Sequence, residues 1–311
     1  MRVTDLRVFL SCMESCIRQG LMGEVCTTPK PGLVDLKDNG AHHDMDIHTF
    51  ERSTDAITPY LVKMAETGCL FDGEITELFP LIRALGIEAE EAMLEATGGV
   101  NTHKGIIFTL GILVSAAGYI YGKYGCGKGK TTSLPPDSLT AMLTDARRMV
   151  TPHLRKDMSR MRKAAPVTHG EKIFRKYGIP GIRGEAMGGF PSLAYIAVPA
   201  MKKGLREQPD ENAARLHVLL SLMASVDDTN ILTRAGYSAL CGVRTSARDF
   251  LEHYPVIDSR AVKRLEEMNR EFIRRRISPG GCADLLAAAI FWEKYESRIP
   301  LLYPERIAIL L

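Results

Sequence analysis

The longest apolar run of the chain, Ile106 to Tyr121, limits the fold more than any other feature. It is shorter than the roughly 20 residues that a helix needs to span a bilayer, and it contains Thr109, Ser115 and two glycines. A run of this kind is typical of a helix that is buried on all sides in a large core. We therefore predict a central buried helix around which the rest of the chain packs.

Apolar residues recur at helical spacing in nearly every other segment, and the alternation typical of strands is hard to find. The pattern predicts helices over residues 6–25, 50–64, 88–96, 138–149, 211–226, 259–276 and 282–295. Prolines at Pro59, Pro80 and Pro152 interrupt helical patterns, which predicts a kink or a split at each. Because short turns rather than a linker separate the segments, residues 1–311 are predicted to form a single all-α domain, a multi-helix bundle.

Charge and cysteine content exclude several classes of function. A net charge of +3 with 25% charged residues favours neither nucleic-acid nor membrane-surface binding, so a local cluster of cations must meet any anionic ligand. Seven cysteines without a C-x-x-C pair argue against a disulfide framework and a zinc site, and indicate reduced thiols. The N-terminus lacks the unbroken apolar stretch of a signal peptide. A cytoplasmic protein without nucleic-acid or membrane partners is expected.

The octet GGVNTHKG, residues 98–105, directly precedes the apolar run. The start of a helix presents unpaired N–H groups and a partial positive charge, and both favour a phosphate. The candidate nucleotide-binding residues of the octet are Gly98, Gly99, Asn101, Thr102 and Lys104, with His103 as a further donor. The alternative is a simple helix start in which Asn101 or Thr102 caps the first turn.

Further basic residues occur in glycine- or proline-rich segments. Two prolines stiffen the backbone around Lys30, which could hold its ammonium group against a phosphate, although Pro-x-Pro-Gly is also an ordinary helix exit. Arg183 lies between glycines, where its guanidinium could approach a phosphate or form a structural pair with Glu185. Arg234 follows an acidic cluster, and another glycine-opened helix start contains Gly280 and Gly281.

Four aspartates are candidate magnesium ligands, because carboxylate oxygens suit nucleotide-bound magnesium. Asp44 and Asp46 follow two histidines, but Asp46 could instead cap the next helix. Asp227 and Asp228 follow an apolar helix, whose dipole disfavours two acids at its C-terminus unless a cation compensates. Magnesium or Arg234 would provide that charge, and solvated acids are the alternative.

Together these parts predict a polyphosphate ligand. The chain has no evident Ser/His/Asp or Cys/His arrangement, so it should bind a nucleotide by its phosphates and transfer part of it directly or hydrolyse it. The segment 121–133, YGKYGCGKGKTTS, resembles the end of a Walker A motif, but Tyr124 occupies the position where that motif needs glycine. We interpret this segment as a flexible surface connection.

Seven motifs occur in the order TPKPGLVD, GAHxDMDxxTF, GGVNTHKG, THGE, GIRGEAxxGFP, DTNxxxR and GGxADLLA, from about Gly23 to Leu286. In this order they resemble the triphosphoribosyl-dephospho-CoA synthase family. The resemblance implies an all-helical enzyme that joins ATP to the 2′-hydroxyl of 3′-dephospho-CoA and releases adenine. Its product would be the prosthetic-group precursor for the acyl-carrier protein of citrate lyase or malonate decarboxylase, attached by a separate transferase. Ala235, Cys282 and Ile106 depart from the family pattern by packing-scale changes.

The resemblance assigns hypothetical roles to the candidate residues. The phosphate-binding cations would be Lys30, Lys104 and Arg183. The magnesium ligands would be Asp227 and Asp228 with Asp44 or Asp46. The general base would be one of Glu171, Glu185 and Asp284. The group that protonates the departing adenine would be His103 or His169.

Two other functions fit the same residues. Helical ADP-ribosyl hydrolases use Asp-Asp-Thr clusters with magnesium, so Asp227-Asp228-Thr229 is also compatible with hydrolysis. A nucleotide-sensing protein without turnover is the second alternative. The apolar tail Ile307 to Leu311 is compatible with a docked or intersubunit end, and hence with a homodimer.

Overall fold

The computed structural model describes residues 3–124, 138–163, 166, 168–298 and 302. Within these ranges the only regular elements are helices, which confirms the all-α prediction. The surface connection predicted over residues 121–133 is wrong for Tyr121 to Tyr124, because the buried helix continues through them. The rest of that segment and the apolar tail from Ile307 lie outside the described residues. The prediction that residues 1–311 form one domain stays a prediction.

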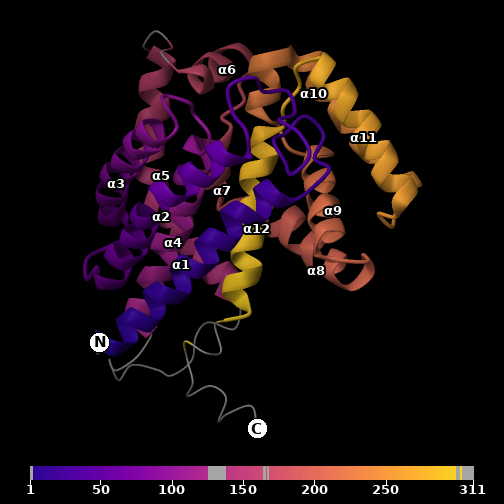
Figure 1. The fold of residues 1–311 in the computed structure, drawn as a ribbon. Coiled ribbons are helices and arrows are strands. Elements are labelled where there is room, and N and C mark those ends of the chain that lie inside the picture. The colour runs from indigo at the N-terminus through magenta and orange to yellow at the C-terminus, as the bar shows by residue number, and fades with distance from the viewer. Residues whose placement is uncertain (1–2, 125–137, 164–165, 167, 299–301, 303–311) are drawn as a thin grey trace.

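The helices fall in the following order along the chain (Figure 1). They are α1 (Val3–Cys26), α2 (Ile47–Leu70), α3 (Ile75–Ala96), α4 (Lys104–Tyr124), α5 (Ser138–Lys163), α6 (His169–Tyr177), α7 (Ile182–Gly188), the π-helical turn η1 (Leu193–Ala197), α8 (Val198–Glu207), α9 (Glu211–Met223), α10 (Thr229–His253), α11 (Ser259–Arg274) and α12 (Gly280–Glu296).

Helix α4 is the buried centre that the apolar run predicted. Every residue from 106 to 121 except Phe108 is buried. Helix α2 packs against it most extensively, and α3, α5, α7 and α12 also contact it. By length and composition α4 could cross a membrane, but most of it is buried inside the protein, as in the core helix of a soluble protein.

Glycines bring the backbones of α2 and α4 into direct contact. A Cβ atom on Gly118 would lie 2.1 Å from the carbonyl oxygen of Ala65, and one on Gly68 would lie 2.2 Å from the carbonyl oxygen of Ser115. Both distances are far below van der Waals contact. Gly118 inside the apolar run and Gly68 on α2 are therefore required by this close helix pair.

We expect Gly118→Ala to destabilise the protein by about 1–3 kcal/mol, because α2 and α4 must separate to accept the methyl group. Gly86→Ala on α3 is the matched control: its Cβ would meet only the terminal methyl of Met64, at 3.8 Å, so that variant should be neutral or slightly stabilising. Urea denaturation of both variants measures the difference. Equal stability of the two variants would contradict the close-contact argument.

The prolines do not divide their helices as predicted. Pro59, Pro80 and Pro152 lie inside α2, α3 and α5, and each helix continues through its proline. A proline removes only one backbone hydrogen bond, and packing of the flanking turns can hold the helix together. The non-helical backbone occurs instead in α10 at Gly236, where φ is 81° and ψ is −178°.

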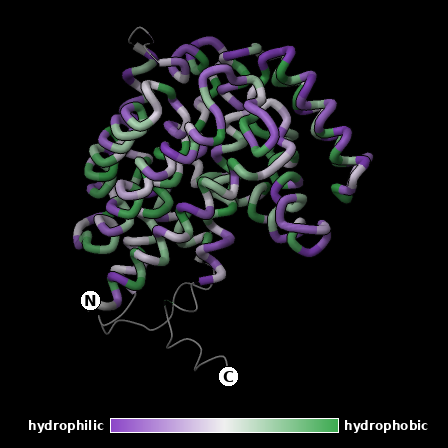
Figure 2. Tube along the Cα trace, viewed as in Figure 1, coloured by the Kyte–Doolittle hydropathy of each residue, from purple (hydrophilic) through white to green (hydrophobic). Residues whose placement is uncertain are grey.

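Helices α1 and α12 pack along each other, and α11 lies at the edge of the molecule with a largely hydrophilic outer surface (Figures 1 and 2). The long connection 27–46 joins α1 to α2. Its Gly32 N–H donates to the side-chain oxygen of Asn269 on α11 at 2.8 Å, which fixes the connection against this outer helix.

Candidate active site

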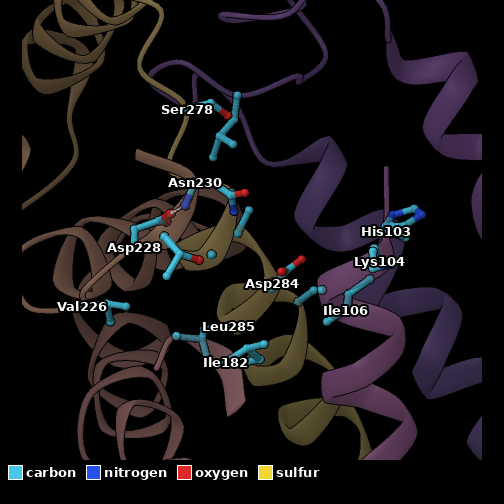
Figure 3. Close-up of a pocket in the computed structure, with 18 of the residues that line it drawn as sticks. His103, Lys104, Ile106, Ile182, Val226, Asp228, Asn230, Ser278, Asp284 and Leu285 are labelled. Atoms are coloured by element: carbon cyan, nitrogen blue, oxygen red, sulfur yellow. Dashed lines mark hydrogen bonds between the residues drawn. The ribbon is translucent and has the colours of Figure 1, made fainter. Parts of the chain in front are cut away.

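A cavity of about 480 Å³ lies where α4, α10 and α12 begin (Figure 3). It is lined near the start of α4 by residues 101–106 and near the start of α10 by residues 225–230. Near the start of α7 it is lined by residues 179–182, 184 and 185, and near the start of α12 by residues 278, 280, 281, 283–285 and 287. Residues of α1 and of the connection 27–46 complete the wall. The start of a helix carries a partial positive charge, and besides the short α7 the cavity gathers three such ends, those of α4, α10 and α12.

The cavity brings many of the predicted residues together. Those that line it are Asn101, Thr102, His103, Lys104, Glu185, Asp227, Asp228, Arg234, Gly280, Gly281 and Asp284. Those outside its lining are Lys30, Asp44, Asp46, Gly98, Gly99, His169, Glu171 and Arg183. Most residues predicted at helix starts line the cavity. Several of the predicted cations and metal ligands lie outside it.

Asp228 joins the starts of two helices. One carboxylate oxygen accepts from the N–H groups of Asn230 at 2.8 Å and Ile231 at 3.2 Å, which caps α10. The other accepts from the N–H of Cys282 in α12, at 2.9 Å. Burial raises the pKa of Asp228, and the three backbone donors oppose that rise. Backbone N–H groups in the first turns of α10 and α12 thus already have the Asp228 carboxylate as their hydrogen-bond acceptor.

Asp284 projects from α12 into the space facing α4 (Figure 3). Its carboxylate lies against the first turn of α4, where a Cβ atom on Gly105 would be only 1.9 Å from its Oδ2 atom. Among the described residues its carboxylate has no hydrogen-bond donor. Burial raises the pKa of Asp284 well above the ordinary aspartate value, and the nearby Asp228 and Glu24 raise it further. A carboxyl group with a raised pKa that faces a cavity is a candidate proton acceptor.

Lys30 is buried beneath the cavity and paired with an acid. Its side chain is 1% exposed, and its ammonium group contacts both the carboxylate and, at 2.7 Å, the carbonyl oxygen of Glu24. Burial raises the pKa of Glu24, and Lys30 opposes that rise. This geometry leaves the ammonium group of Lys30 engaged inside the protein, so its predicted contact with a phosphate has no support from its position.

Glu24, Asp228 and Asp284 together form what we call the acidic floor of the cavity. Their carboxyl groups lie deep in the protein, and Glu24 is the member that the sequence reasoning missed. It lies on the buried side of α1, next to the core residue Val25, and an acid at such a position is the signal that could have identified it.

Two cations that line the cavity, Lys104 and Arg234, are exposed, and we call them the basic rim. Lys104 pairs with Glu90 at 2.6 Å, and its side chain remains 57% exposed. The guanidinium of Arg234 donates to the carbonyl oxygen of Ala41 at 2.6 Å. Both charges can therefore reach a ligand at the mouth of the cavity without first leaving a buried pair.

Two histidines in the wall are neutral at physiological pH. Burial lowers the pKa of His103 to about 3, and its Nδ1 atom lies 2.6 Å from the hydroxyl of Ser53. Burial and the charge of Arg234 lower the pKa of His42 to about 4. An imidazolium at His103 is therefore unavailable near pH 7, which argues against the predicted transfer of its proton to adenine.

Glu185 is held in the wall by a turn that follows α7. Its carboxylate accepts from the N–H of Ser192 at 3.1 Å and from the Ser192 hydroxyl at 2.6 Å. The turn contains Phe190 with a φ of 53°, a left-handed conformation that is rare for such a residue. Glu185 faces the cavity with its acceptors in use, whereas Asp284 faces it without a donor.

The predicted residues outside the cavity lining have local roles or exposed positions. Asp46 caps α2 and Glu171 forms a capping box with Thr168 at the start of α6, which confirms the capping alternative for Asp46. His169 is exposed in α6, and Gly98 and Gly99 form the positive-φ turn after α3. Asn101, which does line the cavity, accepts from the N–H of Lys104 at 3.2 Å at the start of α4.

The four candidate magnesium ligands do not converge. Asp227 pairs with Arg244 at 2.8 Å, and Asp228 uses its oxygens for backbone donors. The side chain of Asp44 is 64% exposed, beside His42. In the described part of the chain, no group of three or more histidine, cysteine or acidic side chains could hold a metal ion. The described residues therefore give no support for a magnesium site built from protein ligands alone, and the predicted ligands stay a prediction.

Comparison with known proteins identifies the family of the chain. A profile of the family described as ATP:dephospho-CoA triphosphoribosyl transferase matches residues 11–300. No solved structure matches the chain.

Three curated relatives carry the same name, probable 2-(5''-triphosphoribosyl)-3'-dephosphocoenzyme-A synthase. The protein of Streptococcus mutans serotype c is 38% identical over 283 residues, which are 90% of this chain and 95% of the relative. The protein of Photobacterium profundum is 38% identical over 86% of this chain and 82% of the relative. The protein of Vibrio cholerae serotype O1 is 37% identical over 89% of this chain and 85% of the relative. The chain belongs to the ATP:dephospho-CoA triphosphoribosyl transferase family.

Proposed function

We propose that the protein transfers the 5-triphosphoribosyl group of ATP to the 2′-hydroxyl of 3′-dephospho-CoA and releases adenine. The observation that carries this proposal is the carboxyl group of Asp284, which faces a cavity at three helix starts in a chain of this family. The names of the relatives specify both the triphosphoribosyl group and the dephospho-CoA acceptor.

In the proposed reaction, the bond between the acceptor oxygen and C1 of the ATP ribose forms as the bond from C1 to adenine breaks. The proton of the 2′-hydroxyl passes to Asp284, which acts as the general base. The electrons of the broken bond leave with adenine, which takes up a proton from solvent, and Asp284 then returns its own proton to solvent, so that the reaction is balanced in protons. Because the ribose carries positive charge in an oxocarbenium-like transition state, the acidic floor stabilises it where the charge develops.

The basic rim gives the substrate an orientation. A triphosphate is repelled by Glu24, Asp228 and Asp284 and attracted by Lys104 and Arg234. The phosphates should therefore lie at the mouth of the cavity and the ribose at its floor. This orientation places C1 of the ribose next to Asp284 and leaves the rest of the cavity for the acceptor.

Incubation with ATP and dephospho-CoA tests the proposed reaction, with free adenine followed by chromatography and the product by mass spectrometry. We expect adenine only when both substrates are present. Adenine from ATP alone would indicate hydrolysis, and binding without adenine would indicate a sensor. The structure favours neither alternative, because Asp227 and Asp228 are already bound to Arg244 and to backbone donors.

We expect Lys104→Ala to weaken ATP binding by about 1–3 kcal/mol, because it removes a charged donor from the basic rim. Lys202→Ala is the matched control: Lys202 is equally exposed and also paired with an acid, Glu296, but it lies on α8 outside the cavity lining. Measuring the KM for ATP at low and high salt tests both. An unchanged KM for the Lys104 variant would remove that residue from the site.

We also propose that the product is the prosthetic-group precursor for the acyl-carrier protein of citrate lyase or malonate decarboxylase, and that a separate transferase attaches it. The six described cysteines are free thiols, which supports a reducing cytoplasm as the compartment. Pull-down with candidate carrier-protein transferases and sedimentation analysis would test the downstream partner and the homodimer.

A further inference from the structure

The acidic floor holds more negative than positive charge. Glu24, Asp228 and Asp284 are close enough that both other carboxylates raise the pKa of Asp284. Among the described residues of this region, Lys30 is the buried cation, and its ammonium group is bound to Glu24. Asp228 has its oxygens on backbone donors, so the charge of Asp284 is the one that faces an incoming ligand directly.

The acceptor hydroxyl must come within about 3 Å of its base for the proton to move. The 2′ and 3′ oxygens of a ribose lie on adjacent carbons. A phosphate on the 3′ oxygen would therefore be held within about 5 Å of the same carboxylate. That phosphate carries a charge of about −1.5 to −2 near neutral pH, and the rim cations lie at the mouth of the cavity rather than at its floor.

We propose that Asp284 determines acceptor specificity by repelling a 3′-phosphate, so that the site admits dephospho-CoA and rejects CoA. The inference rests on the proposed function and adds a second role for the same residue. Two unit charges 5 Å apart at a typical protein dielectric correspond to about a hundredfold loss of affinity. The dephosphorylated acceptor lacks this repulsion, because it presents only a neutral hydroxyl at that position.

Calorimetric titration with dephospho-CoA and with CoA tests the proposal without turnover. Inorganic triphosphate is kept at saturation so that the phosphate end of the site is filled. At a pH above the raised pKa of Asp284, where its carboxyl group is ionised, we expect the wild type to bind dephospho-CoA about a hundredfold more tightly than CoA. Asp284→Asn should reduce this ratio at least tenfold, mainly by tightening CoA. Glu185→Gln removes a different cavity carboxylate and should leave the ratio unchanged.

The outcomes separate the inference from the proposed function. Equal wild-type affinities for the two acceptors, or a ratio that Asp284→Asn does not change, would overturn the specificity role while adenine release still supports transfer. Failure of dephospho-CoA to bind would overturn both. Circular dichroism and a melting curve establish that each variant is folded, and Asp284→Glu, which retains the charge, should keep the wild-type preference if it is folded.

Discussion

Replacing Asp284 by asparagine is expected to lower kcat/KM for adenine release by about 10²- to 10⁴-fold, because the acceptor hydroxyl loses its general base. In the wild type, kcat/KM should rise with pH through the raised pKa of Asp284, well above the ordinary aspartate range, since only the ionised form accepts a proton. The residual kcat/KM of the variant should not show this rise with pH. Steady-state assays across pH measure both effects.

The same substitution should increase stability. Since the pKa of Asp284 is higher in the folded than in the unfolded protein, ionisation of this group costs stability as the pH rises from the ordinary aspartate value through the raised one. Asparagine avoids that cost. The stability advantage of the variant should therefore shrink as the pH falls toward the ordinary aspartate value, which denaturation at several pH values would show.

Two controls make the result specific. Glu185→Gln removes another cavity carboxylate, and a larger loss of activity there would transfer the base to Glu185. Gly105→Ala places a methyl group where the Asp284 carboxylate lies, and displacement of about 1 Å can cost up to about a hundredfold in rate. Full activity of Asp284→Asn at every pH would contradict the proposed mechanism.

Lys30→Met is expected to destabilise the protein by about 3–5 kcal/mol, because it leaves Glu24 buried and without its partner. The double variant Glu24→Gln/Lys30→Met should recover much of that loss, because both charges are then absent. Urea denaturation measures stability, and the KM for ATP is measured on the same proteins. An ATP affinity near that of the wild type in the double variant would assign Lys30 a structural role.

The opposite pattern would contradict this assignment. If the Lys30 ammonium group held a phosphate, Lys30→Met would remain stable and bind ATP weakly, and the double variant would not recover binding. Lys37→Met is a suitable control. Lys37 lies on the same connection as Lys30, but its side chain is 50% exposed and pairs on the surface with Glu266 of α11. Surface pairs contribute little, so its stability should change by less than about 1 kcal/mol.

The fold was predictable where buried apolar residues recur at a regular spacing in the sequence. The apolar run identified α4, and the patterns over 259–276 and 282–295 closely match α11 and α12. Helices with polar outer turns were underestimated: α5 continues from Met149 to Lys163 through a charged segment, and α3 begins at Ile75, before Pro80. In these segments packing, rather than local preference, sustains the helix.

The candidate site was only partly predictable, because sequence shows which groups are present but not which are already paired. The sequence placed Asp228 after the end of an apolar helix, as a magnesium ligand, and Asp284 among three candidate bases. In the structure Asp228 joins the starts of two helices, whereas Asp284 faces the cavity without a donor. The sequence suggested that Lys30 is free to bind a phosphate, because its ion pair with Glu24 is visible only in the structure. Burial also changed the chemistry expected of His103.

The carboxylate of Asp228 has a mechanical consequence. Because one side chain is shared by the first turns of α10 and α12, the separation of those turns is set by the span of a single carboxyl group. These hydrogen bonds couple the first turns of the two helices to each other. If the cavity widens to admit a long acceptor, we expect the parts of its wall that come from α7 and from the connection 27–46 to move before this coupled pair.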